Sequence, residues 1–141
     1  MEKTTEAKAG LPTLRQLVAG IDIGSEEHWV AGPPKPDGTA NVRRFKTTTE
    51  QLKALVDWLE TQHIESVAME STGMYWVPIY ELLEARGIEA VLVNAKEFHN
   101  VPGRPKTDIR DCQWLQQLHS CGLLRGSFRP DEDFLPIAPA V

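Results

Sequence analysis

The sequence predicts an α/β fold: a mixed β-sheet with three antiparallel N-terminal strands, flanked by helices. Two observations lead to this prediction. Short apolar runs rich in β-branched residues alternate with segments whose apolar side chains recur at helical spacing. Three of the strand-like runs precede the first helical segment, and from there helices and strands alternate one by one, as they do where helices join parallel strands.

The chain begins with a polar segment that lacks these patterns. Residues 1–13 are therefore expected to be a disordered lead-in, with structure starting near Leu14. The first strand is predicted at Leu17–Ile23, an apolar run that carries Asp22 near its end, and Gly24 then permits a turn.

The second and third strands are predicted at His28–Ala31 and Asn41–Thr47. Between them lies a cluster of prolines and glycines that contains the turn dipeptide Asp37-Gly38. This arrangement is typical of an antiparallel hairpin with a long loop.

A helix is predicted over residues 48–62. Thr47 and Glu50 have the spacing of a capping box at its start. Apolar residues then recur on one helical face: Leu52, Leu55, Val56 and Leu59. We expect this face to pack on the sheet.

Two more strands and one more helix follow. The strand Glu65–Ser71 carries Glu70 at its exit. A helix over 76–86 is expected to end at Gly87, because glycine commonly follows the last helical turn. The apolar run Ile88–Asn94 then predicts another buried strand.

The last predicted element is a helix. After a short helical turn, the loop VPGRPKT holds two prolines that cannot continue a helix. Thr107 is then expected to cap a helix that runs to about Cys121, with Gly122 ending it. The order β-β-β-α-β-α-β-α is that of the RNase H-like fold. The length fits one such domain over 14–130, followed by a tail at 131–141.

Four acidic residues stand where a sheet of this kind collects ligands. Asp22 and Glu70 each end a buried strand, and Asp108 and Asp111 lie three apart in the first turn expected for the last helix, hence on one face. Each acid alone has a structural interpretation, as a turn residue or as a favourable charge at a helix N-terminus. Together they indicate function, because a carboxylate that ends an apolar strand is costly unless it is paired or binds metal.

Carboxylates are the ligands that Mg²⁺ and Mn²⁺ prefer, and two such ions about 3.5–4 Å apart can drive phosphodiester cleavage. The sequence therefore predicts a catalytic site for two Mg²⁺ or Mn²⁺ ions. Its ligands would be Asp22, Glu70, Asp108 and Asp111.

Charge is distributed unevenly along the chain. The formal net charge of −5 argues weakly against nucleic-acid binding. Between residues 96 and 129, however, six basic residues accompany only three acidic ones. Arg104, Lys106 and Arg110 flank the proposed ligands, so we predict that they contact phosphate of DNA or RNA.

Two bulk features bear on location and redox state. No apolar run approaches the ~18 residues that cross a bilayer, and the polar start lacks the core of a secretory signal, so a cytoplasmic location is expected. Cys112 and Cys121 form no metal-ligand spacing and are expected to be reduced and partly buried.

At GIDIG, AMESTG, PGRPKTDIRDC and SCGLLRGSFRP the chain resembles the N-terminal domain of DEDD transposases of the insertion-sequence one-hundred-ten family, relatives of the Piv DNA invertase. The resemblance covers roughly Leu17 to Pro130 and implies a RuvC-type, RNase H-like domain. Its D, E, D and D correspond to Asp22, Glu70, Asp108 and Asp111. Cys112 departs from the family pattern, which usually has alanine there; a small buried residue fits both.

The resemblance also implies a DNA substrate, a bridge RNA that selects target and donor sequences, and a homo-oligomer. Full-length members carry a C-terminal domain with the serine thought to attack DNA, and nothing here matches it. The serines that do occur do not correspond to it: Ser25, Ser66, Ser71, Ser120 and Ser127. The chain is therefore expected to hold half of a composite active site and to be inactive alone.

The ending DEDFLPIAPAV departs from the linker expected in this family. A frameshift, a premature stop or a cut copy would explain this departure. Phe134 and Leu135 would then be exposed and could find a partner surface.

Two other functions stay open. GIDIGS also resembles the first phosphate loop of sugar-kinase and actin-like ATPases, although those proteins need two such lobes; an ATP-dependent thermal shift would favour this function. The other is a non-catalytic truncated module that binds nucleic acid or assembles with full-length copies. An out-of-frame second domain in the DNA downstream of Val141 would favour that module.

Overall fold

The computed structural model describes residues 15–71, 73–94 and 110–124. Within them lie the strands β1 (Val18–Asp22), β2 (Glu27–Ala31), β3 (Val42–Lys46), β4 (Ser66–Glu70) and β5 (Glu89–Val93). The helices are α2 (Thr49–Thr61), α3 (Val77–Ala85) and α5 (Asp111–Ser120). Residues 1–13 and 131–141 lie outside this part of the chain, so the predicted domain boundaries stay predictions.

The five strands form one sheet in the order β3-β2-β1-β4-β5. The pairs β1–β2 and β2–β3 are antiparallel, whereas β1–β4 and β4–β5 are parallel. This topology confirms the predicted mixed sheet with three antiparallel N-terminal strands.

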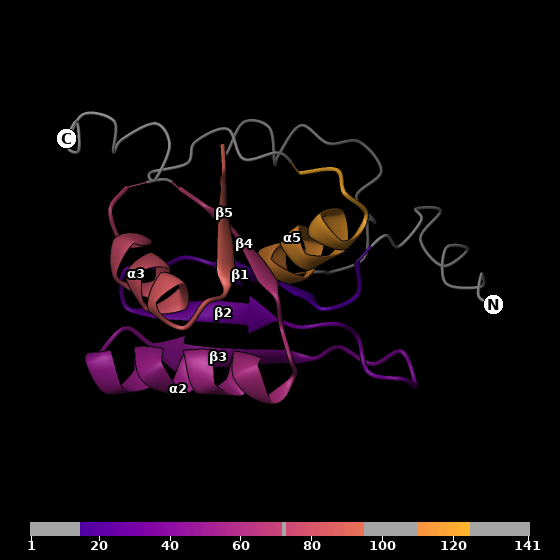
Figure 1. Cartoon of the computed structure of the whole chain (residues 1–141), viewed down its shortest axis with the longest axis horizontal. Coiled ribbons are helices and arrows are strands. Elements are labelled where there is room, and N and C mark those ends of the chain that lie inside the picture. The colour runs from indigo at the N-terminus through magenta and orange to yellow at the C-terminus, as the bar shows by residue number, and fades with distance from the viewer. Residues whose placement is uncertain (1–14, 72, 95–109, 125–141) are drawn as a thin grey trace.

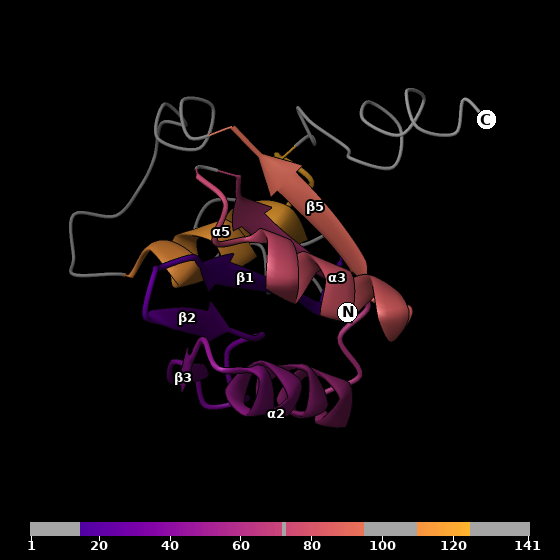
Figure 2. The same cartoon turned by 90° about the vertical axis from the view of Figure 1, so that its left-hand side faces the viewer.

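Helices cover both faces of the sheet: α2 and α3 lie on one side and α5 on the other (Figures 1 and 2). Side chains alternate between the faces along each strand. Ile21 and Met69 belong to the larger apolar core under α2 and α3. Ala68 and Val93 pack instead with Trp114 of α5. A residue's place in this alternation therefore says which helix layer it faces.

Helix α5 lies unusually close to β1, at Gly20. A Cβ atom at this position would stand 2.5 Å from the carbonyl oxygen of Cys112 and 2.6 Å from the backbone nitrogen of Gln116. The side chain of Gln116 also donates a hydrogen bond of 3.1 Å to the carbonyl oxygen of Val18. The helix can approach the central strand this closely only because Gly20 has no side chain.

The N-cap residues predicted for two helices were wrong, although α2 begins within one residue of its predicted start. Thr48, not Thr47, caps α2, because its side chain accepts a hydrogen bond from the backbone nitrogen of Gln51 at 3.3 Å. Helix α5 begins at Asp111, with Arg110 in extended conformation at its N-cap, rather than after Thr107. A proline-rich segment precedes Thr107, and the capping preference of threonine alone did not locate the first helical turn.

The predicted helix ends agree with the structure. Gly87 follows the C-cap of α3 with φ +78°, and Gly122 follows that of α5 with φ +74°. The short helical turn predicted after β5 lies outside the described residues. The cysteines Cys112 and Cys121 are both free, and both are buried. No helix in the described part of the chain is long and apolar enough to cross a membrane.

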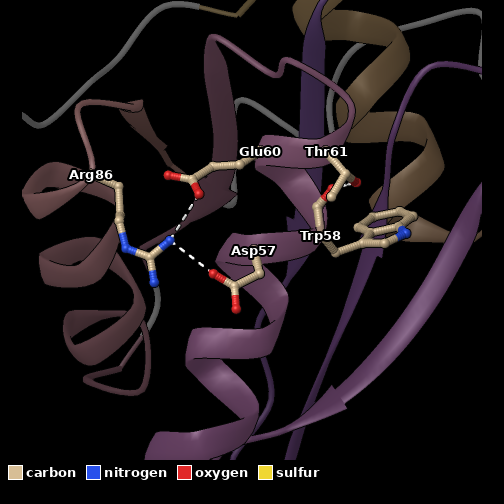
Figure 3. A network of polar contacts seen from close by, with 5 residues as sticks. All are labelled: Asp57, Trp58, Glu60, Thr61 and Arg86. Atoms are coloured by element: carbon tan, nitrogen blue, oxygen red, sulfur yellow. Dashed lines mark hydrogen bonds and ion pairs between the residues drawn. The ribbon is translucent and has the colours of Figure 1, made fainter.

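A polar network joins α2 to the end of α3 (Figure 3). The guanidinium of Arg86 donates to Asp57 at 2.9 Å and to Glu60 at 3.0 Å. Surface ion pairs of this kind contribute little individually. The network links the two helices at the surface, on the sheet face opposite to α5.

Candidate catalytic site at the end of the central strands

Asp22 and Glu70 are the last residues of β1 and β4, which are neighbouring parallel strands. Because Ile21 pairs with Met69, the two acids that follow lie side by side at the same edge of the sheet. Ile21 and Met69 face the core under α2 and α3. By alternation, Asp22 and Glu70 face the side of α5.

Asp111, the first residue of α5, brings a third carboxylate near enough to act on the charge of Asp22. The pKa of Asp22 is raised above its ordinary value, first by burial and then by the negative charges of Asp111 and Glu70, while Arg110 lowers it. The carboxylates of Glu70 and Asp111 therefore both act electrostatically on that of Asp22. A cation bound among them would relieve this repulsion.

The turn after Asp22 is held from the next strand. The backbone nitrogen of Gly24 donates a 3.1 Å hydrogen bond to Nδ1 of His28, whose side chain is buried. Burial lowers the pKa of His28 and so keeps the imidazole neutral and able to accept this bond. A Cβ at Gly24 would collide with the carbonyl oxygen of Glu27, so the turn needs glycine.

Three of the four predicted ligands, Asp22, Glu70 and Asp111, are thus brought to one edge of the sheet. Asp108 lies outside the described residues, and because α5 starts at Asp111 the predicted placement of both aspartates in one helical turn is not supported. Within residues 15–71, 73–94 and 110–124, no three histidine, cysteine or acidic side chains stand in an arrangement that could hold a metal ion. The described acids alone therefore do not form a complete coordination sphere.

A cationic and aromatic assembly lies beside the acids. The Arg110 guanidinium carbon stands 3.6 Å from the centre of a Trp29 ring, and that of Arg44 stands 5.8 Å from the Trp29 ring. Arg110 was predicted from the sequence, but Trp29 and Arg44 were not. What brings them to the acids is the register of the strands, in which Trp29 pairs with both Asp22 and Arg44. The other two predicted phosphate contacts, Arg104 and Lys106, lie outside the described residues.

The profile of the DEDD transposase family of the IS110 type, described as a transposase, matches residues 19–138. The chain belongs to this family. The matched range begins inside β1, includes Asp22 and continues beyond α5. A comparison with curated proteins gave no match. The protein is thus a transposase with a role in DNA transposition and recombination, and its mixed sheet with flanking helices is the family's RNase H-like fold.

This transposase also holds a serine–histidine pair that sequence reasoning did not predict. Ser66 Oγ and His119 Nε2 are 2.8 Å apart, but both side chains are buried between β4 and α5. Burial lowers the pKa of His119 to about 4. A pair closed off from solvent cannot meet DNA, so it stabilises the contact between helix and sheet and is not a nucleophile with its base.

The buried His119 makes this transposase domain acid-sensitive. Its folded pKa, about 4, lies below the ordinary value of 6.5, so the stability that the neutral imidazole contributes is present above pH 6.5 and is lost as pH falls toward 4. The free energy of unfolding should decrease by about 2 kcal/mol more between pH 7.5 and pH 5 in the wild type than in His119→Gln. Urea titrations at the two pH values measure this difference. His63→Gln, which changes an exposed imidazole, is the control; equal decreases in all three proteins would contradict the assignment.

Proposed function

We propose that Asp22, Glu70, Asp108 and Asp111 bind divalent metal, Mg²⁺ or Mn²⁺ and two ions when complete, for DNA strand cleavage and transfer during transposition of an insertion sequence. The observation that carries the proposal is the convergence of Asp22, Glu70 and Asp111 from three elements at one edge of the sheet. Carboxylate oxygens are the donors that these hard cations prefer.

Each group has a distinct part in this site. Asp22 and Glu70 sit at the ends of two paired strands, which gives them the most rigid positions. Asp111 depends on the packing of α5, because the helix places it. A bound metal ion would polarise the phosphodiester and activate the attacking oxygen. Arg110 lies close enough to lower the pKa of Asp22, and its positive charge would hold a phosphate beside the acids.

Asp108 is proposed as the ligand that completes the coordination sphere. The described acids do not close around a metal by themselves. Asp108 precedes Arg110 by two residues in the sequence, so as a ligand it would come from the segment before α5. A fourth carboxylate from that segment would allow the site to close when metal binds.

The proposed partners are DNA, a bridge RNA and further copies of the chain. Arg104, Lys106 and Arg110 are proposed to contact the nucleic-acid backbone, since phosphate is the ligand that needs both cations and metal. The segment 14–130 is proposed as one domain.

Reconstituted recombination with Mg²⁺, a matched bridge RNA, donor DNA and target DNA tests this function. Residues 1–141 assayed by themselves should yield no recombinant product, because metal ions activate a nucleophile but do not replace the serine that the family resemblance places in a second domain. The same residues joined to that domain should yield product, which Asp22→Ala abolishes. Product from residues 1–141 alone, or full product from the joined Asp22→Ala variant, would contradict the proposal. Metal binding by a joined protein that never forms product would favour the non-catalytic module.

A further inference from the structure

The face of the sheet that carries the acids continues as a basic strip over β2 and β3. In the register, Asp22 pairs with Trp29, and Trp29 pairs with Arg44. Paired residues point to the same face, so the three side chains form a row across three strands. Lys46 lies on this same face, two residues beyond Arg44. The row spans about 10 Å from Arg44 to Asp22, the width of two strand spacings.

Two guanidiniums share Trp29 as their support. Arg110 stacks closely at 3.6 Å from the centre of a Trp29 ring, and Arg44 stands 5.8 Å from the Trp29 ring. A guanidinium that lies on a ring keeps its N–H groups, which point outward in its own plane, available for a phosphate. Both arginine residues are exposed. The stacking therefore orients cations without occupying their hydrogen-bonding edges.

Glu27 contacts both Trp29 and Arg44. Its carboxylate accepts a 3.3 Å hydrogen bond from the Trp29 indole nitrogen and lies 3.6 Å from the Arg44 guanidinium. One carboxylate beside Arg44 and Lys46 leaves an excess of positive charge on the two strands, and Arg110 adds a further cation next to the acids. A pairing this exposed is weak, so it leaves Arg44 available to bind a phosphate.

We infer that Arg44, Lys46 and Arg110, with Trp29 as the positioning residue, form a phosphate-binding strip that guides one nucleic-acid strand across β3 and β2 to the acids at Asp22. The inference rests on the proposed metal site only in one respect, namely that the guided nucleic-acid strand is expected to reach that site. Its ligand is the phosphodiester backbone, which DNA and RNA share. An acidic cluster repels phosphate, and the strip supplies compensating charge directly beside it.

The strand offers a matched control, because Arg43 and Arg44 are neighbours on opposite faces of β3. Arg43 is also exposed, but it lies over the rings of Phe45 and Trp58 on the α2 side. Arg44→Gln and Arg43→Gln therefore remove the same charge from the same strand. Only the first removes it from the strip.

The test is fluorescence anisotropy with labelled single-stranded DNA, single-stranded RNA and duplex DNA of one sequence, over a series of salt concentrations in EDTA. Arg44→Gln should weaken binding about fivefold to tenfold and reduce the slope of log affinity against log salt by about 0.7–0.9, the contribution of one phosphate contact. Arg44→Gln combined with Lys46→Gln should reduce the slope by about twice as much. Arg43→Gln should leave affinity and slope unchanged. Thermal unfolding checks that every variant is folded.

Trp29→Leu separates positioning from charge. It retains every cation, and it should still lower the salt slope if the ring orients Arg44 and Arg110 for phosphate. Equal affinities and slopes for Arg44→Gln and Arg43→Gln with all three nucleic acids would overturn the strip. A preference of the wild type for RNA or for DNA, lost in Arg44→Gln, supports the strip and identifies which strand it guides.

Because EDTA removes metal, these results do not depend on whether the proposed ligands bind metal. A separate Mn²⁺ titration of the wild type and Arg44→Gln keeps the two ideas apart. An Arg44→Gln effect on nucleic acid in a protein that binds no Mn²⁺ would support the strip and count against the metal site. Mn²⁺ binding with no Arg44→Gln effect would do the reverse.

Discussion

Asp22→Asn is expected to weaken Mn²⁺ binding at least tenfold, about 1.4 kcal/mol, and at the same time to stabilise the metal-free protein at neutral pH. Both effects have one cause. Burial and the charges of Asp111 and Glu70 raise the pKa of Asp22, so its ionised carboxylate opposes folding unless a cation is present. Calorimetric Mn²⁺ titration and thermal unfolding in EDTA measure the two changes.

Asp57→Asn is the control for this prediction, since it removes a carboxylate on α2 that pairs with Arg86 away from the acids. It should leave Mn²⁺ affinity unchanged and should not stabilise the protein. The increase in the free energy of unfolding caused by Asp22→Asn should also become smaller as pH falls. Because the pKa of Asp22 is raised, the wild-type carboxyl group is protonated at a higher pH than an ordinary one, and it then no longer opposes folding. Loss of stability in metal-free Asp22→Asn would mean that the carboxylate has a structural partner instead of a metal.

Gly20→Ala should lower the free energy of unfolding by about 3 kcal/mol, at the upper end for an overpacked site. The added Cβ would meet backbone atoms of Cys112 and Gln116, which cannot rotate away as a side chain can. Helix α5 must therefore move off β1 as a unit. Because α5 begins with Asp111, Mn²⁺ affinity should fall as well. Urea denaturation and metal titration together measure this coupling.

Gly38→Ala separates steric collision from backbone strain. Gly38 has φ +87°, and a Cβ added there would meet nothing within 4 Å, so its substitution should cost roughly 1 kcal/mol and leave metal binding intact. A Gly20→Ala protein as stable as Gly38→Ala would show that α5 can shift without loss. The close approach at Gly20 would then not be what positions the third carboxylate.

Much of the sheet could be predicted from local pattern because each strand carries its own signal. Asp22 and Glu70 were found as acids that end apolar runs, whereas the parallel pairing of their two strands is seen only in the structure. The end of a strand can be located from the neighbouring sequence alone, without knowing which distant residues contact it. The same local reasoning failed at the start of α5, where Thr107 had the expected chemistry but Arg110 occupies the N-cap.

The basic strip could not be predicted from the sequence, for a different physical reason. Trp29 and Arg44 are fifteen positions apart and carry no motif; only the register across β2 and β3 puts them together. Arg43 and Arg44 look equivalent in the sequence, yet one belongs to the α2 face and the other to the face of the acids. Which residues of β2 and β3 pair depends on the conformation of the loop between the two strands. The sequence alone does not specify that register.

Anomalous scattering from a crystal grown with Mn²⁺ tests whether Asp22, Glu70 and Asp111 bind metal together with Asp108. A manganese peak is expected at the edge where β1 and β4 end, about 2.1 Å from carboxylate oxygens of Asp22 and Glu70. Asp108 and Asp111 should complete the ligand set around this ion or a second ion about 3.5–4 Å away. If no manganese peak appears at that edge at millimolar Mn²⁺, and Asp22 and Glu70 share no ion, the proposed metal site is wrong.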